Sequence, residues 1–261
     1  MKKYTFLKFA VLLLVISQIA SSCTKVIDVD IKDQEANFVV EGFVTLGDLT
    51  HRVSITKTLN LDDASNFPTV DNASIYLTDN LGNGQNMVLV APGVYEVSNY
   101  PVSEGRTYTI QISVDGKVFV AKGKMPVNVP LEIVETFPFS FGPEPINALV
   151  PIRFDPAGIE NYYQFNLIVK GKNIPGNFIQ SDQYNDGNIN QEPIFATEIK
   201  AGDTVDVVMF GIDKSIYNYF FTLEQNIQGA TPANPTSNFS GGCLGYFSVR
   251  TKSEKQIIIP L

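Results

Sequence analysis

Short runs in which apolar and polar residues alternate, separated by turn residues, recur along most of this chain and restrict its possible folds. A period of two places every second side chain on one face, so such runs predict half-buried β-strands. In the first half of the chain the expected strands cover residues 37–46, 52–59, 73–78, 86–90, 94–98, 107–114 and 117–121. Turn signals every ~8–12 residues are typical of a β-sandwich. Residues 37–126 are therefore predicted to form an immunoglobulin-like or transthyretin-like sandwich.

Two of the turns between these strands have specific chemistry. Asp115-Gly116 lies between two alternating runs, and a hairpin turn of this kind needs a positive φ at both central residues. Pro92-Gly93 fits a type II turn, in which proline sets φ at the second position and glycine takes the left-handed third position. Both dipeptides support antiparallel pairing of the flanking strands.

Prolines change the character of the chain after Met125. They stand at Pro126, Pro130, Pro138, Pro143, Pro145 and Pro151. Each proline lacks a backbone donor, so we expect no central strand here, and part of the stretch should be a semi-rigid connection. The domain boundary is placed near residue 127, and residues 127–261 are predicted to form a second β-rich domain. Its expected strands cover residues 150–154, 162–170, 204–212, 244–251 and 256–259.

One segment of the second half has helical spacing. Ile216, Tyr219, Phe220, Leu223 and Ile227 fall on one helical face. Either Asp213 or Ser215 is available as the N-cap, and Gly229 as the stop. The fold class is thus all-β, with two β-sandwich domains and one short amphipathic helix near residues 214–228 in the second.

The N-terminus has the order of a secretion signal. An apolar run at residues 9–16 is preceded by the basic residues Lys2, Lys3 and Lys8. A segment of small and polar residues follows the run, as in a signal peptide. The sequence Ile-Ala-Ser-Ser-Cys at residues 19–23 resembles a lipobox, in which the cysteine thiol receives a lipid. We predict a signal peptide at residues 1–22, a lipid on Cys23 and a tether over residues 23–36. The alternative is ordinary signal cleavage, with Cys23 a bystander.

The net charge makes nucleic acid an unexpected partner, and the cysteine content limits the possible disulfides. Removal of the signal takes away three of the 19 basic residues and none of the 27 acidic ones, which leaves a net charge of −11. Binding to phosphate backbones depends on Lys and Arg, so nucleic acid is not an expected partner. The chain has two Cys, so a lipidated Cys23 leaves Cys243 without a partner for a disulfide. Cys243 is expected to be a small buried residue.

The candidate sites are few. Residues 182–189 overlay the first eight positions of a calcium loop, with Asp182 and Asp186 as carboxylate ligands. Tyr184 stands at position three and Pro193 at position twelve, where a bidentate Glu is needed, so an exposed Asx-type turn is the alternative. Both carboxylates are expected to be exposed and unpaired. The chain has a single histidine, His51, which is expected to be an ordinary strand-edge residue, and we predict no catalytic residue.

Aromatic residues suggest a contact surface. The run Phe-Pro-Phe-Ser-Phe at residues 137–141 lies in the proline-rich stretch and is predicted to expose apolar surface for a ligand or partner. Phe139, Phe141 and Tyr184 are the candidate contact residues. The chain has no Trp, which disfavours a glycan platform built on large rings.

Several stretches together resemble a known lipoprotein family. They are Cys23–Asp30, Phe38–Gly42, Pro92–Tyr95, Gly105–Tyr108, Asp115-Gly116, Asn161–Tyr163 and Gly241–Phe247. This ordered set resembles the family catalogued as domain of unknown function 4249, found in Bacteroidetes-type bacteria. The resemblance implies an envelope lipoprotein, commonly encoded near a TonB-dependent outer-membrane transporter, with no established activity and no catalytic residues to carry over. It also favours a packing role at Cys243.

The sequence leaves three functional hypotheses. The leading one is a non-enzymatic outer-membrane lipoprotein, held by lipid such as palmitate, that captures or gates a solute for a TonB-dependent transporter, because binding residues often lie in loops on such scaffolds. The second is a structural or adhesive envelope module. The third is a metal-assisted enzyme that uses the acidic loop from Asp182 to Asp186.

Overall fold

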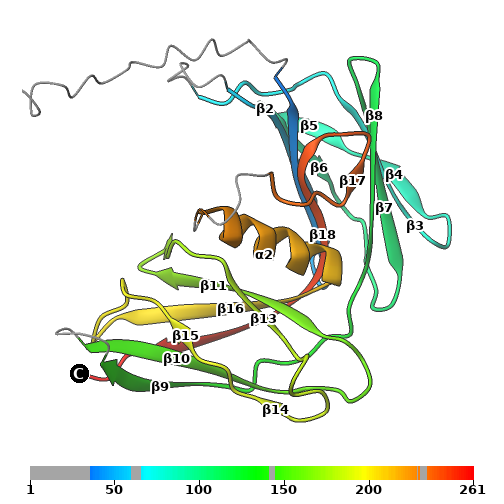
Figure 1. The fold of residues 1–261 in the computed structure, drawn as a ribbon. Helices are drawn as coiled ribbons and strands as arrows, with labels where there is room; N and C mark the ends of the chain where they lie inside the picture. Colours follow the sequence, from blue (N-terminus) through cyan, green and yellow to red (C-terminus); the bar gives the residue numbers. More distant parts are fainter. Residues whose placement is uncertain (1–35, 60–65, 141–144, 228, 230–233) are drawn as a thin grey trace, which may run out of the picture. The chain divides into compact units, whose positions relative to one another are not determined.

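Three β-sheets and one α-helix make up the part of the chain that the structure describes (Figure 1). The computed structural model describes residues 36–59, 66–140, 145–227, 229 and 234–261. The largest sheet has nine strands, and eight of them follow one another in space. Their order is β12 (Lys172–Asn173), β11 (Tyr162–Val169), β16 (Thr204–Ile212), β18 (Leu244–Ile258), β1 (Phe38–Thr45), β2 (His51–Lys57), β6 (Val94–Val97) and β5 (Val88–Ala91), with β13 (Phe178–Ser181) beside β11.

The two smaller sheets each face part of this large sheet. The five-stranded sheet has the order β17 (Phe239–Ser240), β8 (Lys117–Lys124), β7 (Thr107–Val114), β3 (Ser74–Asp79) and β4 (Gly84–Asn86). The four-stranded sheet has the order β14 (Ile189–Asn190), β10 (Pro145–Phe154) and β15 (Ile194–Phe195), with β9 (Ile133–Ser140) also paired with β10. The helix is α2 (Lys214–Ile227), and among the described residues no helix is both long and apolar enough to span a membrane. The all-β prediction is confirmed.

The first sandwich has its core between β1, β2 and β6 on one side and β3, β7 and β8 on the other. Alternate residues of β7, from Tyr108 to Val114, are almost fully buried in this core, as the period of two predicts. The turn between β7 and β8 has φ values of 48° at Asp115 and 74° at Gly116. The predicted hairpin is therefore present, and Val114 pairs with Lys117 across it.

The second sandwich has its core between β11 and β16 on one side and β9, β10 and β15 on the other. Leu149 of β10, Leu167 of β11 and Val207 of β16 are fully buried there. The opposite face of β16 is covered by α2, against which Val208, Phe210 and Ile212 pack (Figure 1).

Helix α2 begins and ends where its capping residues predict. The Asp213 Oδ1 atom accepts hydrogen bonds from the backbone N–H groups of Ser215 and Ile216, at 2.9 and 3.1 Å, which makes Asp213 the N-cap. Beyond the last turn, Gly229 has a φ of 74°, and its N–H donates to the Asn226 carbonyl.

The proline-rich stretch differs from its prediction, because β9 and β10 form a hairpin through it. Pro138 lies in β9, which pairs only with β10 among the described strands, so its missing donor falls on an unpaired edge. Pro151 lies in β10 beyond the two residues that pair with β15. Pro138 therefore lies on an edge strand, and Pro151 lies between the residues of β10 that pair with β15 and those that pair with β14.

The division of the chain also differs from the sequence-based one in one respect. The core changes between Met125 and Val129, close to the expected boundary. However, the first half of β18 pairs with β1 in parallel, and its second half pairs with β16. Phe239, Cys243 and Phe247 consequently pack in the first core, although parts of the second sandwich precede and follow them in sequence. Contacts join residues 36–261 into one compact unit.

Candidate functional site

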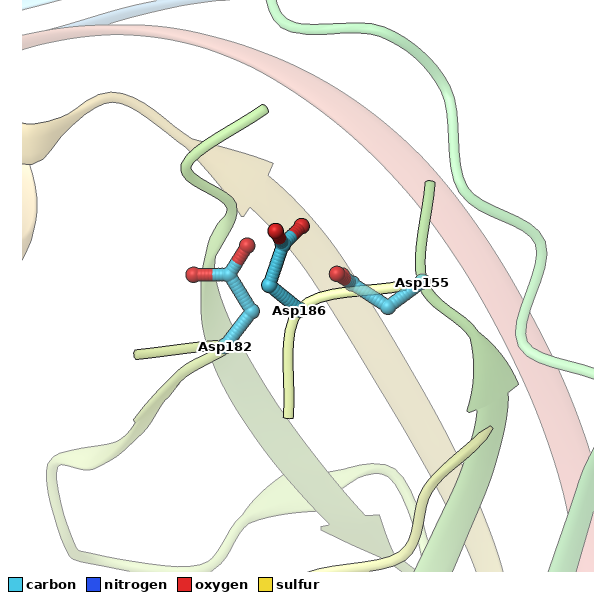
Figure 2. Close-up of side chains that lie close together, drawn as sticks. All are labelled: Asp155, Asp182 and Asp186. Atoms are coloured by element: carbon cyan, nitrogen blue, oxygen red, sulfur yellow. The ribbon is translucent and has the colours of Figure 1, made fainter. Parts of the chain in front are cut away.

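Three aspartates from separate turns lie close together at one end of the second sandwich. Asp155 follows β10, Asp182 follows β13, and Asp186 lies in the turn before β14. One carboxylate oxygen from each lies within 4.8 Å of the other two. Figure 2 shows the three carboxylates gathered in one place.

Backbone and side-chain donors hold each carboxylate. The Asp182 Oδ2 atom accepts a hydrogen bond from the Asn161 backbone N–H at 2.8 Å. The Asp186 Oδ1 atom accepts one from the Gly158 N–H, also at 2.8 Å. Asp155 accepts from the Tyr163 hydroxyl at 2.8 Å and from the Gly187 N–H at 3.3 Å. The cluster therefore ties the loop at residues 182–187 to the ends of β10 and β11.

Burial makes this cluster electrostatically unfavourable. Asp155 and Asp182 are 6% and 3% exposed. Burial, followed by the neighbouring Asp182 carboxylate, raises the pKa of Asp155 above its usual value. Because the folded state holds this proton more tightly than the unfolded state, the contribution of Asp155 to stability is greatest at low pH and declines as pH rises through its raised pKa.

The structure corrects the prediction for this loop. Asp182 was expected to be exposed and unpaired, but it is buried and hydrogen-bonded, because the loop folds back over the start of β11. Asp186 is exposed as expected, yet it also has a backbone partner. Tyr184 is 90% exposed and has no part in the cluster. The third carboxylate, Asp155, was missed, because it comes from a distant strand and no local spacing connects it to the loop.

Three carboxylates are oxygen ligands of the kind that hard cations prefer. Calcium takes about 6–8 oxygens, and here each of the three side chains already accepts a backbone hydrogen bond through one oxygen. Calcium binding by Asp182 and Asp186 stays a prediction, and Asp155 joins them as the third available ligand.

An open cleft of about 560 Å³ adjoins this cluster. Asp182 and Asp186 are among its lining residues, and the start of α2 contributes Lys214, Tyr217 and Asn218. Its volume is within the range of small-molecule sites, about 300–1,000 Å³.

The charges of the cleft do not balance. The Lys214 ammonium donates to Glu160 at 3.0 Å, and the Tyr162 hydroxyl donates to the same carboxylate at 2.9 Å. The Glu160 carboxylate raises the pKa of Lys214, and Lys214 lowers the pKa of Glu160, so both groups stay charged and neutralise each other. Asp182 and Asp186 remain as the uncompensated charges of the lining, which makes the cleft acidic.

Two tyrosine rings border the same cleft. The rings of Tyr162 and Tyr217 are tilted against each other, with centroids 5.0 Å apart. Tyr217 also stacks on Phe221, one turn further along α2, at 6.1 Å. The sequence contained no signal that these aromatic residues border a cleft.

The other predicted residues lie elsewhere. Phe139 is 38% exposed on β9, in agreement with the predicted apolar surface, whereas Phe141 lies outside the described residues. Cys23, with the signal and tether, also lies outside them. Cys243 is free and buried as predicted, and burial raises the pKa of its thiol to about 12.

His51 is more enclosed than a strand-edge residue. It is 2% exposed, and its Nε2–H donates to the Tyr100 carbonyl at 2.9 Å. Burial lowers the pKa of the imidazole, which favours the neutral form. These contacts give His51 a structural role in the first sandwich.

Comparisons with known proteins give a family and little else. No curated protein matches the sequence. Among solved structures, a two-domain fibronectin type III segment of chicken tenascin is similar at 12% identity, with a TM-score of 0.24, over 68% of this chain and 91% of that one. The family model for the domain of unknown function DUF4249 matches residues 24–256. The chain therefore belongs to the DUF4249 family.

Proposed function

We propose that this protein is an outer-membrane lipoprotein that captures a small solute in the acidic cleft, as a non-enzymatic accessory of a TonB-dependent transporter. The observation that carries the proposal is the open cleft beside Asp182 and Asp186. It combines charged groups with aromatic walls on a β-sandwich, where loops and helix ends commonly form binding sites.

The chemistry of the lining favours a solute that carries an amine. The Asp186 carboxylate is exposed, and the single lysine of the cleft is already paired with Glu160. An ammonium group gains from such a carboxylate, and it also gains from the faces of neighbouring tyrosine rings such as Tyr162 and Tyr217. A carboxylate or phosphate solute would meet like charge instead.

Calorimetry with a panel of aliphatic amines and diamines, and with dicarboxylates of the same length, tests this proposal. We expect amines to bind and dicarboxylates not to bind. Asp186→Asn should weaken amine binding roughly 10-fold or more, because a charge-assisted hydrogen bond contributes about 1.5–3 kcal/mol. Glu198→Gln, which removes an exposed carboxylate outside the cleft lining, is the control and should leave binding unchanged. Equal binding of both panels would refute the preference for amines, and binding of neither would refute capture of an amine at this cleft.

Membrane attachment through Cys23 has its own test. Cys23→Ala should move the protein from the membrane to the soluble fraction and abolish metabolic labelling with palmitate, because two or more acyl chains are needed for stable anchoring. Cys243→Ala is the matched control, since it removes the other cysteine and should leave labelling and fractionation unchanged. Retention of the Cys23→Ala protein in washed membranes would show that another part of the chain holds it there.

A structural or adhesive role in the envelope is the second candidate. Exposed apolar side chains on the four-stranded sheet, among them Phe137, Phe154 and Phe195, favour it, because exposed apolar patches mark contact with other macromolecules. Affinity purification from detergent-solubilised membranes separates the two roles. Recovery of a TonB-dependent transporter supports the accessory role, and its absence in the presence of other envelope proteins supports the structural one.

A further inference from the structure

The second sandwich has two outer faces, and they differ in what covers them. Helix α2 packs on the outer face of β16 and β11, where Phe210 and Ile216 are buried (Figure 1). On the other side of the sandwich, the outer face of the four-stranded sheet has no helix over it among the described residues.

Register shows which side chains share that face. Phe137 and Phe195 both pair with Ala148, Phe139 pairs with Ile146, Ile133 with Ile152, and Ile189 with Phe154. Directly paired residues lie on the same face of a sheet, as do alternate residues of β10 from Ile146 to Phe154. Leu149, on the opposite face of β10, is in the core, which identifies the face of Ala148 as the outer one.

This outer face is apolar and exposed. Its exposed apolar side chains are Ile133 (54%), Phe137 (39%), Phe139 (38%), Phe154 (63%), Ile189 (49%) and Phe195 (44%). A fully exposed side chain of this size has a surface of about 200 Å², so the exposed fractions of these six side chains add up to on the order of 500 Å². A patch of this size matches the largest apolar patch on a typical monomer, about 300–600 Å², and such patches are often functional.

We propose that this face is the interface of a symmetric homodimer. A standard interface buries about 800 Å² on each partner, of which about 65% is apolar in homodimers. The apolar area of this face is of the same order as that requirement. A two-fold axis presents the same patch from both subunits, so the face need only be complementary to itself.

Charge also favours a second copy. The chain is acidic, with a net charge of −8, so most of its surface repels another copy. On β9 and β10, Glu135 is the only charged side chain among the described residues of the outer face. Two copies can meet here with little repulsion, whereas a basic partner would find almost no charge to pair with.

Sedimentation velocity of the whole chain carrying Cys23→Ala, which excludes the lipid as a cause of association, tests the dimer. The expected result is a reversible dimer at micromolar concentration. Phe154→Glu and Phe137→Glu should each raise the dissociation constant roughly 100-fold, because they place like charges opposite each other in an apolar contact.

The matched control is Val88→Glu on β5, because Val88 is 63% exposed, as is Phe154, but lies in a different sheet. It should dimerise as the parent does. A thermal melt of each variant identifies any loss of folding, and the milder Phe154→Ser then replaces an unfolded variant. The proposal would be overturned if the parent protein is a monomer at about 100 micromolar, or if the control variant loses its dimer to the same extent as the Phe variants. Binding of the monomer to lipid vesicles through this face would also overturn it.

Discussion

Replacing Gly245 with Ala is expected to lower the free energy of unfolding by at least ~3 kcal/mol, among the larger effects of a single substitution. Gly245 has a φ of 91°, and it pairs with Val40 where β18 runs parallel to β1. A Cβ at this position would lie 1.9 Å from the Val40 carbonyl oxygen and within 3 Å of two further backbone atoms of that residue. The two strands must separate to accept it, because backbone atoms cannot turn aside as a side chain does.

The control for this substitution is Gly242→Ala. Gly242 has nearly the same φ, 90°, but a Cβ there would meet no atom within 4 Å. The conformational strain of an L-residue alone costs about 1–2 kcal/mol. Urea unfolding followed by circular dichroism measures both variants. Similar losses would mean that the approach of β18 to β1 is looser than the structure shows.

Replacing Asp182 with Ala is expected to cost about 2–3 kcal/mol of stability. The substitution leaves the buried Asn161 N–H without its acceptor, and an unsatisfied buried donor carries a cost of this order. Asp186→Ala should cost less than ~1 kcal/mol, because Asp186 and its partner Gly158 are both exposed and water can replace the lost acceptor.

The same unfolding measurements compare these two aspartates. Their sequence context is alike, so a loop of exposed carboxylates predicts small and equal losses. A larger loss for Asp182 supports the buried position found in the structure. Equal, small losses of stability for the two variants would contradict the buried position of Asp182. They would instead support the exposed Asx-type turn that the sequence offered as the alternative.

Local features of this protein could be predicted because their causes are local. The hairpin at Asp115-Gly116 follows from the φ values that its turn requires, and both residues have them. The position of α2 follows from helical spacing between Asp213 and Gly229, which form its caps. Free, buried Cys243 follows from the cysteine count and from its apolar character.

The candidate site could be predicted only in part. The acidic loop containing Asp182 and Asp186 is evident from the sequence, but Asp155 is brought to it by the pairing of β10 with β14. The exposure of Phe139 was predicted from its place in the proline-rich stretch, whereas the same stretch was not expected to form β9 and β10. In each case the missing information was which strands are neighbours.

The sequence by itself therefore determined the β class of the chain, its local turns and the helix with its caps. The tertiary structure alone decided that β18 joins both sandwiches, that Asp182 is buried, and that α2 covers one outer sheet face while no described helix covers the other. The physical reason is that alternation of side chains has the same period of two whichever strand lies alongside. A strand's residues specify that one face is apolar, but the partner strand and the layer above that face are set by contacts between distant parts of the chain.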